Sequence, residues 1–255
     1  MNKNIFYKVR VYYSMKRTIC FFSCWCLFTS SSFSQVVSKN VIKIACIGNS
    51  ITAGARLQHP EMESYPSILA ELLKEKGPSD YRVKNFGIGG ATMLRFGQPN
   101  LWKLLDSVKN FQPDIVVIKA GTNETVAKPR YNWDHIGDFE KDYTDYLTAI
   151  KKVNPQCKII ICSPTDMVLD TEGLSAERKA DLGERRPRIW QLRKRIKKLA
   201  KANKVYYLDL TRAFKNKKSL MTSTDGVHPN QEGYRFLATL VYDFVVKKKI
   251  VIFEY

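Results

Sequence analysis

From Val41 onward, short runs of β-branched and aliphatic residues alternate with longer stretches in which apolar residues recur at helical spacing. Strands that alternate with helices in this way form a mostly parallel sheet with helices on both faces, and such strands are apolar throughout. The predicted strands are Val41–Ile47, Tyr81–Phe86, Asp114–Ile118, Lys158–Cys162 and Val205–Leu208, and the predicted helices are about Tyr65–Lys76, Leu101–Lys109, Gly137–Val153, Arg186–Ala202 and Gln231–Val246. The sequence therefore predicts an α/β fold, a three-layer sandwich around a mostly parallel five-stranded sheet.

The length of 255 residues fits one such domain, and neither a repeat nor a linker divides the chain. Single α/β cores of about 200–250 residues are common. With 44% hydrophobic residues the chain is too apolar for a disordered protein, and with 13 Gly and 10 Pro it is not collagen-like. We therefore expect a single folded domain.

The amino-terminal segment has the pattern of a secretory signal peptide. Met15 is followed by two basic residues, an apolar run from Ile19 to Phe28 and a Ser-rich stretch that reaches Ser34. The run is shorter than the roughly 20 apolar residues that span a bilayer. We predict a leader over residues 1–34, with its true start at Met15, and a domain over residues 35–255 that is exported to the periplasm or beyond the cell.

A lipoprotein anchor is the alternative to a cleaved secretory signal. Cys20, Cys24 and Cys26 lie in or near the apolar run, but the small-residue pattern that usually precedes a lipidated cysteine is missing. The other three cysteines, Cys46 and the pair Cys157 and Cys162, do not form a disulfide framework. No histidine is spaced to share a metal with them, so we expect buried free thiols and no metal site.

The formal charge of +18 raises the possibility of an anionic partner. Five basic residues and no acids lie in the predicted leader, so the exported chain would carry +13. Much of this excess falls on the predicted helix Arg186–Ala202, where apolar residues recur at helical spacing, as on an amphipathic helix with a solvated basic face. We do not expect a nucleic-acid partner, but a non-catalytic protein that binds acidic glycans stays an alternative function.

Two motifs at opposite ends of the chain suggest a catalytic triad. Ser50 follows the first predicted strand, two residues after Gly48, and Asp225 precedes His228 by three positions in the chain's only Asp-x-x-His. On one turn, such an aspartate can reach the imidazole Nδ1 and leave Nε2 for a serine hydroxyl. The alternative is that Ser50 and Asp225 are caps or turn residues and that His228 lies in a surface loop.

Two glycine-containing turns follow the second and third predicted strands. The first reads Gly87-Ile88-Gly89-Gly90-Ala91-Thr92 and the second Gly121-Thr122-Asn123-Glu124. A glycine lets the backbone N–H approach a reacting carbonyl, and an asparagine amide offers a second donor. Both turns are candidates for an oxyanion hole, and either could instead be an ordinary turn or helix cap.

Together and in this order, the four blocks resemble the SGNH hydrolases, also called GDSL esterases and lipases, over about residues 41–246. The resemblance implies a flavodoxin-like fold and a serine esterase that needs no metal or organic cofactor. Asn49 stands where the family's best-known signature has aspartate, and since this is not a triad position we expect the chemistry to be retained.

The resemblance also assigns roles to individual residues. It implies that Ser50 is the nucleophile and that Asp225 and His228 complete the triad. It implies that the backbone N–H groups of Ser50 and Gly90 and the amide of Asn123 form the oxyanion hole. Because two glycines are adjacent, Gly89 is the alternative to Gly90.

Three further residues are candidates for binding substrate. Arg130 and Trp133 lie in the segment Lys128–Trp133, where Trp133 could stack on a sugar or instead pack the loop onto the body, and Arg130 could meet a sugar carboxylate. Asp166 follows the fourth predicted strand and could face the substrate. With the signal peptide, this segment is similar to exported carbohydrate O-acetylesterases of the superfamily, and it implies an acylated polysaccharide or small molecule as substrate.

The acyl group is expected to be short. The loop Gly54–Ser64 is mostly polar and offers little surface for a long acyl chain. A lysophospholipase or long-chain acyl esterase, which needs an apolar groove, is the alternative enzyme.

Overall fold

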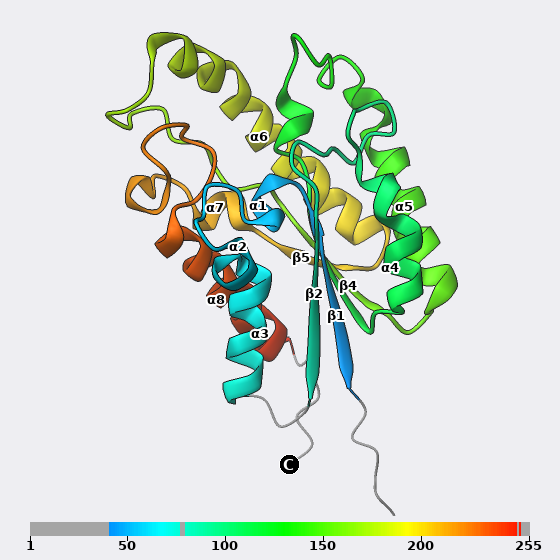
Figure 1. Cartoon of the computed structure of the whole chain (residues 1–255). Helices are drawn as coiled ribbons and strands as arrows, with labels where there is room; N and C mark the ends of the chain where they lie inside the picture. Colours follow the sequence, from blue (N-terminus) through cyan, green and yellow to red (C-terminus); the bar gives the residue numbers. More distant parts are fainter. Residues whose placement is uncertain (1–40, 77–79, 249, 251–255) are drawn as a thin grey trace, which may run out of the picture. The chain divides into compact units, whose positions relative to one another are not determined.

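The computed structural model describes residues 41–76, 80–248 and 250, and the predicted leader lies outside them. Its centre is a five-stranded, all-parallel sheet in the order β2-β1-β3-β4-β5 (Figure 1). The strands are β1 (Ile42–Gly48), β2 (Tyr81–Gly87), β3 (Ile115–Lys119), β4 (Lys158–Cys162) and β5 (Tyr206–Leu208). The predicted α/β fold with its parallel five-stranded sheet is confirmed.

Helices pack on both faces of the sheet. One face is covered by α3 (Tyr65–Lys76) and α8 (Gln231–Lys247), and the other by α4 (Leu105–Phe111), α5 (Phe139–Val153) and the carboxyl-terminal part of α6 (Ala176–Ala202). The shorter helices are α1 (Ser50–Ala53), α2 (Pro60–Glu63), α7 (Leu210–Ala213), η1 (Leu101–Leu104), η2 (Asn123–Thr125), η3 (Ile136–Asp138) and η4 (Lys218–Leu220). Most of these short helices lie near the carboxyl ends of the strands, where ligands bind in such sheets.

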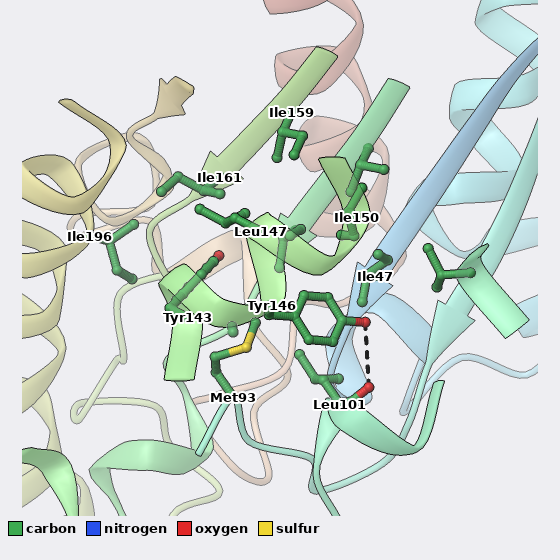
Figure 2. Packing of buried hydrophobic residues seen from close by; sticks show 14 of the residues in the cluster. Ile47, Met93, Leu101, Tyr143, Tyr146, Leu147, Ile150, Ile159, Ile161 and Ile196 are labelled. Carbon is green, nitrogen blue, oxygen red and sulfur yellow. Dashed lines mark hydrogen bonds between the residues drawn. The ribbon is translucent and has the colours of Figure 1, made fainter. Parts of the chain in front are cut away.

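Alternate residues of the central strands supply the two cores. In β3, Val116 and Ile118 join the cluster under α4 and α5, while Ile115 and Val117 join the cluster under α3 and α8, because successive side chains of a strand point to opposite faces. Figure 2 shows part of the first cluster, in which Tyr146 of α5 lies among aliphatic side chains and donates to the carbonyl of Leu101.

The three cysteines of the described chain are buried free thiols, as predicted. Cys46 and Cys162 belong to the core under α3 and α8, and Cys157 belongs to the core on the opposite face. Burial raises the pKa of each thiol to about 12, so all three remain protonated at neutral pH. Within the described ranges no helix is long and apolar enough to cross a membrane.

Two details of the predicted architecture are wrong. The strand β2 is not apolar throughout: it lies at the sheet edge, and Arg82 and Lys84 are exposed. The helix predicted from Arg186 begins ten residues earlier, at Ala176, where the hydroxyl of Ser175 caps it by accepting from the Arg178 N–H at 3.2 Å.

The early start of α6 has a tertiary cause. Leu182 and Ile189 pack in a small third cluster with Met167, Leu174 and Val227, and not against the sheet. The first turns of α6 are therefore mostly polar, and their apolar pattern is too sparse to mark a helix in the sequence.

Candidate active site

Ser50 lies at the carboxyl end of β1, as the first residue of α1. Asn49 caps this helix by accepting from the Ile51 N–H at 3.2 Å. A Cβ atom at Gly48 would lie 2.2 Å from Thr52 Oγ1 and 2.5 Å from the carbonyl oxygen of Lys119, so only glycine fits between α1 and β3. Because Ser50 opens the helix, its N–H has no partner within it.

His228 joins Ser50 to Asp225 by two short hydrogen bonds. The imidazole Nε2 lies 2.8 Å from Ser50 Oγ, and Nδ1 lies 2.7 Å from Asp225 Oδ2. The side chains of His228 and Asp225 are 18% and 8% exposed, so the imidazole lies at the surface of the site and the carboxylate below it. The structure thus brings together the three residues that the sequence singled out.

The Asp225 carboxylate is held on its other oxygen as well. Oδ1 accepts from the Thr222 hydroxyl and from the backbone N–H groups of Val227 and His228, each at 2.9 Å. Burial opposes ionisation of this carboxyl, but the hydrogen bonds from His228 and from the Val227 N–H hold the pKa of Asp225 well below its usual range. The aspartate is therefore ionised wherever the protein is folded at ordinary pH.

The turn that carries Asp225 and His228 is fastened to the loop after β4. The Val168 N–H donates to the carbonyl of Gly226 at 2.9 Å, and the Arg178 Nε donates to the carbonyl of Asp225 at 3.1 Å. Val227 fills the third apolar cluster beside α6. The loop after β4 and the first turns of α6 thus support the turn.

The two glycine-containing turns meet beyond β1. The strand β1 lies between β2 and β3, so the loops that follow its neighbours converge above its end. There Asn123 Nδ2 donates to the carbonyl of Ala91 at 2.9 Å. Gly90 has a left-handed φ of +73° and is half-buried, whereas Gly89 is exposed and meets no atom within 4 Å of an added Cβ.

Glu124, whose role was not predicted from the sequence, joins the two loops that contain these turns by hydrogen bonds. Its buried carboxylate accepts from the Met93 N–H at 2.7 Å and from the Gly121 N–H at 2.9 Å. Burial raises the pKa of Glu124, against the opposing effect of these N–H groups. The sequence offered no sign of this role beyond the position of the glutamate directly after Asn123, because its two partners lie in different loops.

The three candidate substrate residues differ in position. Arg130 Nη2 donates to the carbonyl of Gly90 at 2.7 Å, so this guanidinium lies beside the first turn. Trp133 packs against the core under α5, with the guanidinium of Arg188 5.3 Å from its ring centre, and its position therefore fits the packing alternative.

Asp166 is buried away from the surface. Its carboxylate accepts from Arg186 at 2.7 and 3.1 Å and from the Trp190 indole N–H at 3.1 Å. The hypothesis that Asp166 faces a substrate therefore receives no support from its position, because the neighbouring side chains of α6 already satisfy both oxygens.

The arrangement is suited to nucleophilic catalysis. An imidazole within hydrogen-bond distance of a hydroxyl can accept its proton during attack, and an ionised aspartate on the other ring nitrogen stabilises the resulting imidazolium. In the part of the chain that the structure describes, no group of three or more His, Cys, Asp or Glu side chains is placed to hold a metal ion.

The chain is similar to known proteins over most of its length. The model of the GDSL-like lipase/acylhydrolase family matches residues 46–236. An acetylxylan esterase from Xylanibacter ruminicola is 29% identical over 225 residues, which are 80% of this chain and 43% of that protein. The chain thus spans less than half the length of this curated relative.

Solved structures share the fold over nearly their whole length. A lipase/acylhydrolase from Enterococcus faecalis matches with a TM-score of 0.64 at 23% identity, over 82% of this chain and 97% of that chain. The acetyl xylan esterase AlAXEase matches with a TM-score of 0.58 at 28% identity, over 80% and 100%. A carbohydrate acetylesterase from Sinorhizobium meliloti matches with a TM-score of 0.60 at 18% identity, over 81% and 99%.

Proposed function

The chain belongs to the GDSL-like lipase/acylhydrolase family, and on this premise we propose that it is a serine ester hydrolase that removes a short acyl group, in the first place O-acetyl from a carbohydrate. The observation that carries the proposal is the continuous hydrogen-bonded series from Ser50 through His228 to Asp225. A non-catalytic binding protein has no need of a buried, ionised aspartate behind a histidine that contacts a serine.

The proposed reaction has two steps. His228 Nε2 accepts the Ser50 proton as Oγ bonds to the acyl carbon, and the same proton then passes to the leaving alcohol as the ester bond breaks. Water, deprotonated by His228, attacks the resulting acyl-enzyme, and the proton returns to Ser50 as the acid leaves. Asp225 stays ionised and stabilises the imidazolium in both steps.

We assign the oxyanion hole to the N–H groups of Ser50 and Gly90 and to the amide of Asn123. An asparagine amide has two N–H donors. In Asn123 one of them is used to hold the side chain on the carbonyl of Ala91, and the second is left for the oxyanion. Donors fixed before reaction stabilise the developing charge without a reorganisation cost.

Several observations support a short acyl group on a carbohydrate. The acetylxylan esterase from Xylanibacter ruminicola and the acetyl xylan esterase AlAXEase are relatives with 29% and 28% identity. Arg130 lies beside Gly90 with Nη1 and Nε outside the hydrogen bonds formed by its Nη2, so it is available for a carboxylate on an acidic sugar. We further propose that the protein is exported, on the basis of the leader pattern in residues 1–34.

Hydrolysis of p-nitrophenyl acetate by the Ser50→Ala variant tests the proposal. We expect activity to fall at least about a thousand-fold, because loss of a triad member removes nearly all nucleophilic catalysis. Ser67→Ala is the matched control, since the hydroxyl of Ser67 on α3 bonds only Ser64 and the carbonyl of Glu61 on α2. Full activity in Ser50→Ala would refute the assignment.

The acyl and alcohol groups need their own measurements. Among p-nitrophenyl esters of increasing length, a preference for the two-carbon ester supports an acetylesterase, and a preference for eight or more carbons supports a lysophospholipase or long-chain esterase. Acetate release from acetylated polysaccharides and acetylated sialic acid, with Ser50→Ala as the blank, would identify the sugar. Salt-sensitive retention on heparin without esterase activity would favour the glycan-binding alternative.

A further inference from the structure

Arg56 contacts the proposed triad from the loop that follows the nucleophile. Its Nε lies 3.1 Å from Asp225 Oδ2, the same oxygen that receives the Nδ1 proton of His228 at 2.7 Å. The Arg56 side chain is 58% exposed and the Asp225 side chain 8%. A cation at the surface is thus bonded directly to the carboxylate on which His228 depends.

The backbone around Arg56 is shaped to hold it there. Arg56 has a left-handed φ of +74°, a conformation that is strained for a non-glycine residue. The turn is fixed on both sides of Ala55, whose N–H donates to the carbonyl of Ser50 and whose carbonyl accepts from the Tyr234 hydroxyl at 2.8 Å. These two hydrogen bonds hold the strained turn in place. The turn directs the guanidinium of Arg56 toward Asp225.

The charge of Arg56 bears on the protonation of His228. A nearby cation disfavours a second positive charge, so it opposes formation of the imidazolium by ambient protons. Other charged or titratable groups surround the pair: Arg178 of α6 bonds the carbonyl of Asp225, Asp181 offsets Arg178 at 2.7 Å, and Tyr234 of α8 lies behind Asp225. Among them, only Arg56 places a guanidinium on the carboxylate oxygen shared with His228.

We propose that Arg56 is a positioning residue that acts through Asp225 to keep His228 unprotonated at lower pH, and so extends esterase activity toward acid. The effect on esterase activity rests on the proposed function, but the effect of Arg56 on the protonation of His228 can be measured without turnover. The chain has only three histidines, so the ring signals of His228 can be assigned by NMR.

The test is the titration midpoint of the His228 ring in the whole protein and in Arg56→Gln, followed by NMR. We expect the midpoint to rise by about 0.5 pH unit in Arg56→Gln, a three-fold change in proton affinity, and the acidic limb of kcat/KM to move with it. Arg56→Lys keeps the charge, so we expect less than half of that shift. Arg82→Gln removes an exposed arginine at the start of β2 and should shift nothing.

Salt gives a second measurement, which is made on the wild-type protein. Because Arg56 is largely exposed, 1 M NaCl should screen it and move the wild-type midpoint toward that of Arg56→Gln. Coincident midpoints for wild type and Arg56→Gln, or equal shifts in the Gln and Lys variants, would overturn the inference. A wild-type protein without esterase activity would instead count against the proposed function, since the NMR midpoints are independent of turnover.

Discussion

On the histidine side of the site, the polar groups come from one turn, Asp225 to His228, while the proposed oxyanion donors come from three separate segments. The carboxylate of Asp225 is bonded by a cation at the surface, Arg56, whereas the oxyanion turns are joined by the buried carboxylate of Glu124. Local spacing is sufficient to bring an aspartate to a histidine three positions away. Loops that follow different strands have no such local constraint, and a buried group that accepts from both of them fixes their relative position.

Removal of Arg56 and removal of the Glu124 carboxylate should differ in their effect on stability. An exposed charge is screened by water and salt, so removing Arg56 is expected to change a titration and leave the fold intact. A buried carboxylate that accepts two backbone N–H groups leaves them unpaired when it is removed, which typically costs about 1–3 kcal/mol for each group. The comparison therefore predicts that the loss of Arg56 changes the titration of His228, and that the loss of the Glu124 carboxylate destabilises the fold around the oxyanion turns.

The largest expected effect within the oxyanion side is that of Asn123→Ala. Removing one oxyanion donor should lower kcat about 100- to 1000-fold and change KM much less, because the lost bond forms mainly in the transition state. Steady-state kinetics on p-nitrophenyl acetate provide the measurement. Asn154→Ala is the matched control, because Asn154 Nδ2 also bonds a backbone carbonyl, that of Pro113, at 3.1 Å. An unchanged kcat in Asn123→Ala would remove this residue from the oxyanion hole.

A smaller effect on turnover, joined to a loss of stability, is expected for Glu124→Gln. The N–H groups of Met93 and Gly121 bond different oxygens of Glu124, and in a glutamine one of these oxygens is replaced by an NH2 group that cannot accept. We expect kcat to fall about ten-fold and the free energy of unfolding to fall by about 1–3 kcal/mol.

Kinetics and chemical denaturation of Glu124→Gln would be compared with those of Glu75→Gln, which alters an exposed carboxylate of α3. If Glu124→Gln matched the wild type in both measurements, the buried carboxylate would not be what holds the two turns together.

The smallest effect on activity, and a gain in stability, is expected for Lys119→Met. Lys119 ends β3 beneath these turns, and its Nζ is buried without a hydrogen-bond partner among the described residues. Burial lowers the pKa of Lys119 to about 7. The unfolded lysine stays protonated up to about pH 10.5, so unfolding takes up a proton between these values and wild-type stability should rise with pH from 7 upward.

Denaturation of Lys119→Met should be measured at pH 7 to 8.5. In this range the effect of Lys119 on the pH dependence of stability is separate from that of the buried thiols, which lose protons on unfolding above about pH 9. At pH 7 we expect the variant to be more stable than the wild type by at least about 1 kcal/mol, and its stability to depend less on pH. Lys158→Met changes an exposed lysine and is the control. Equal pH slopes in Lys119→Met and wild type would contradict the expected penalty.

The strands and most helices were predictable because burial on both faces imposes a continuous apolar pattern on β1, β3 and β4. The edge strand β2 does not have this apolar pattern, because several of its side chains face solvent. The start of α6 was missed because its first turns contact the Asp225 turn and not the sheet. The surroundings of Asp166 could not be predicted either, since its position after a strand says nothing about Arg186 and Trp190, which bond its carboxylate.

The sequence by itself predicted the fold class, the free thiols and the pairing of Asp225 with His228, because periodicity and the Asp-x-x-His spacing act over a few positions. Only the tertiary structure decided which groups support them. Arg56 and Asp225 are 169 positions apart, and Glu124 and Met93 are 31 apart. Contacts of this kind depend on which strands are neighbours and on how loops cross their ends, and no local pattern of residues encodes that arrangement.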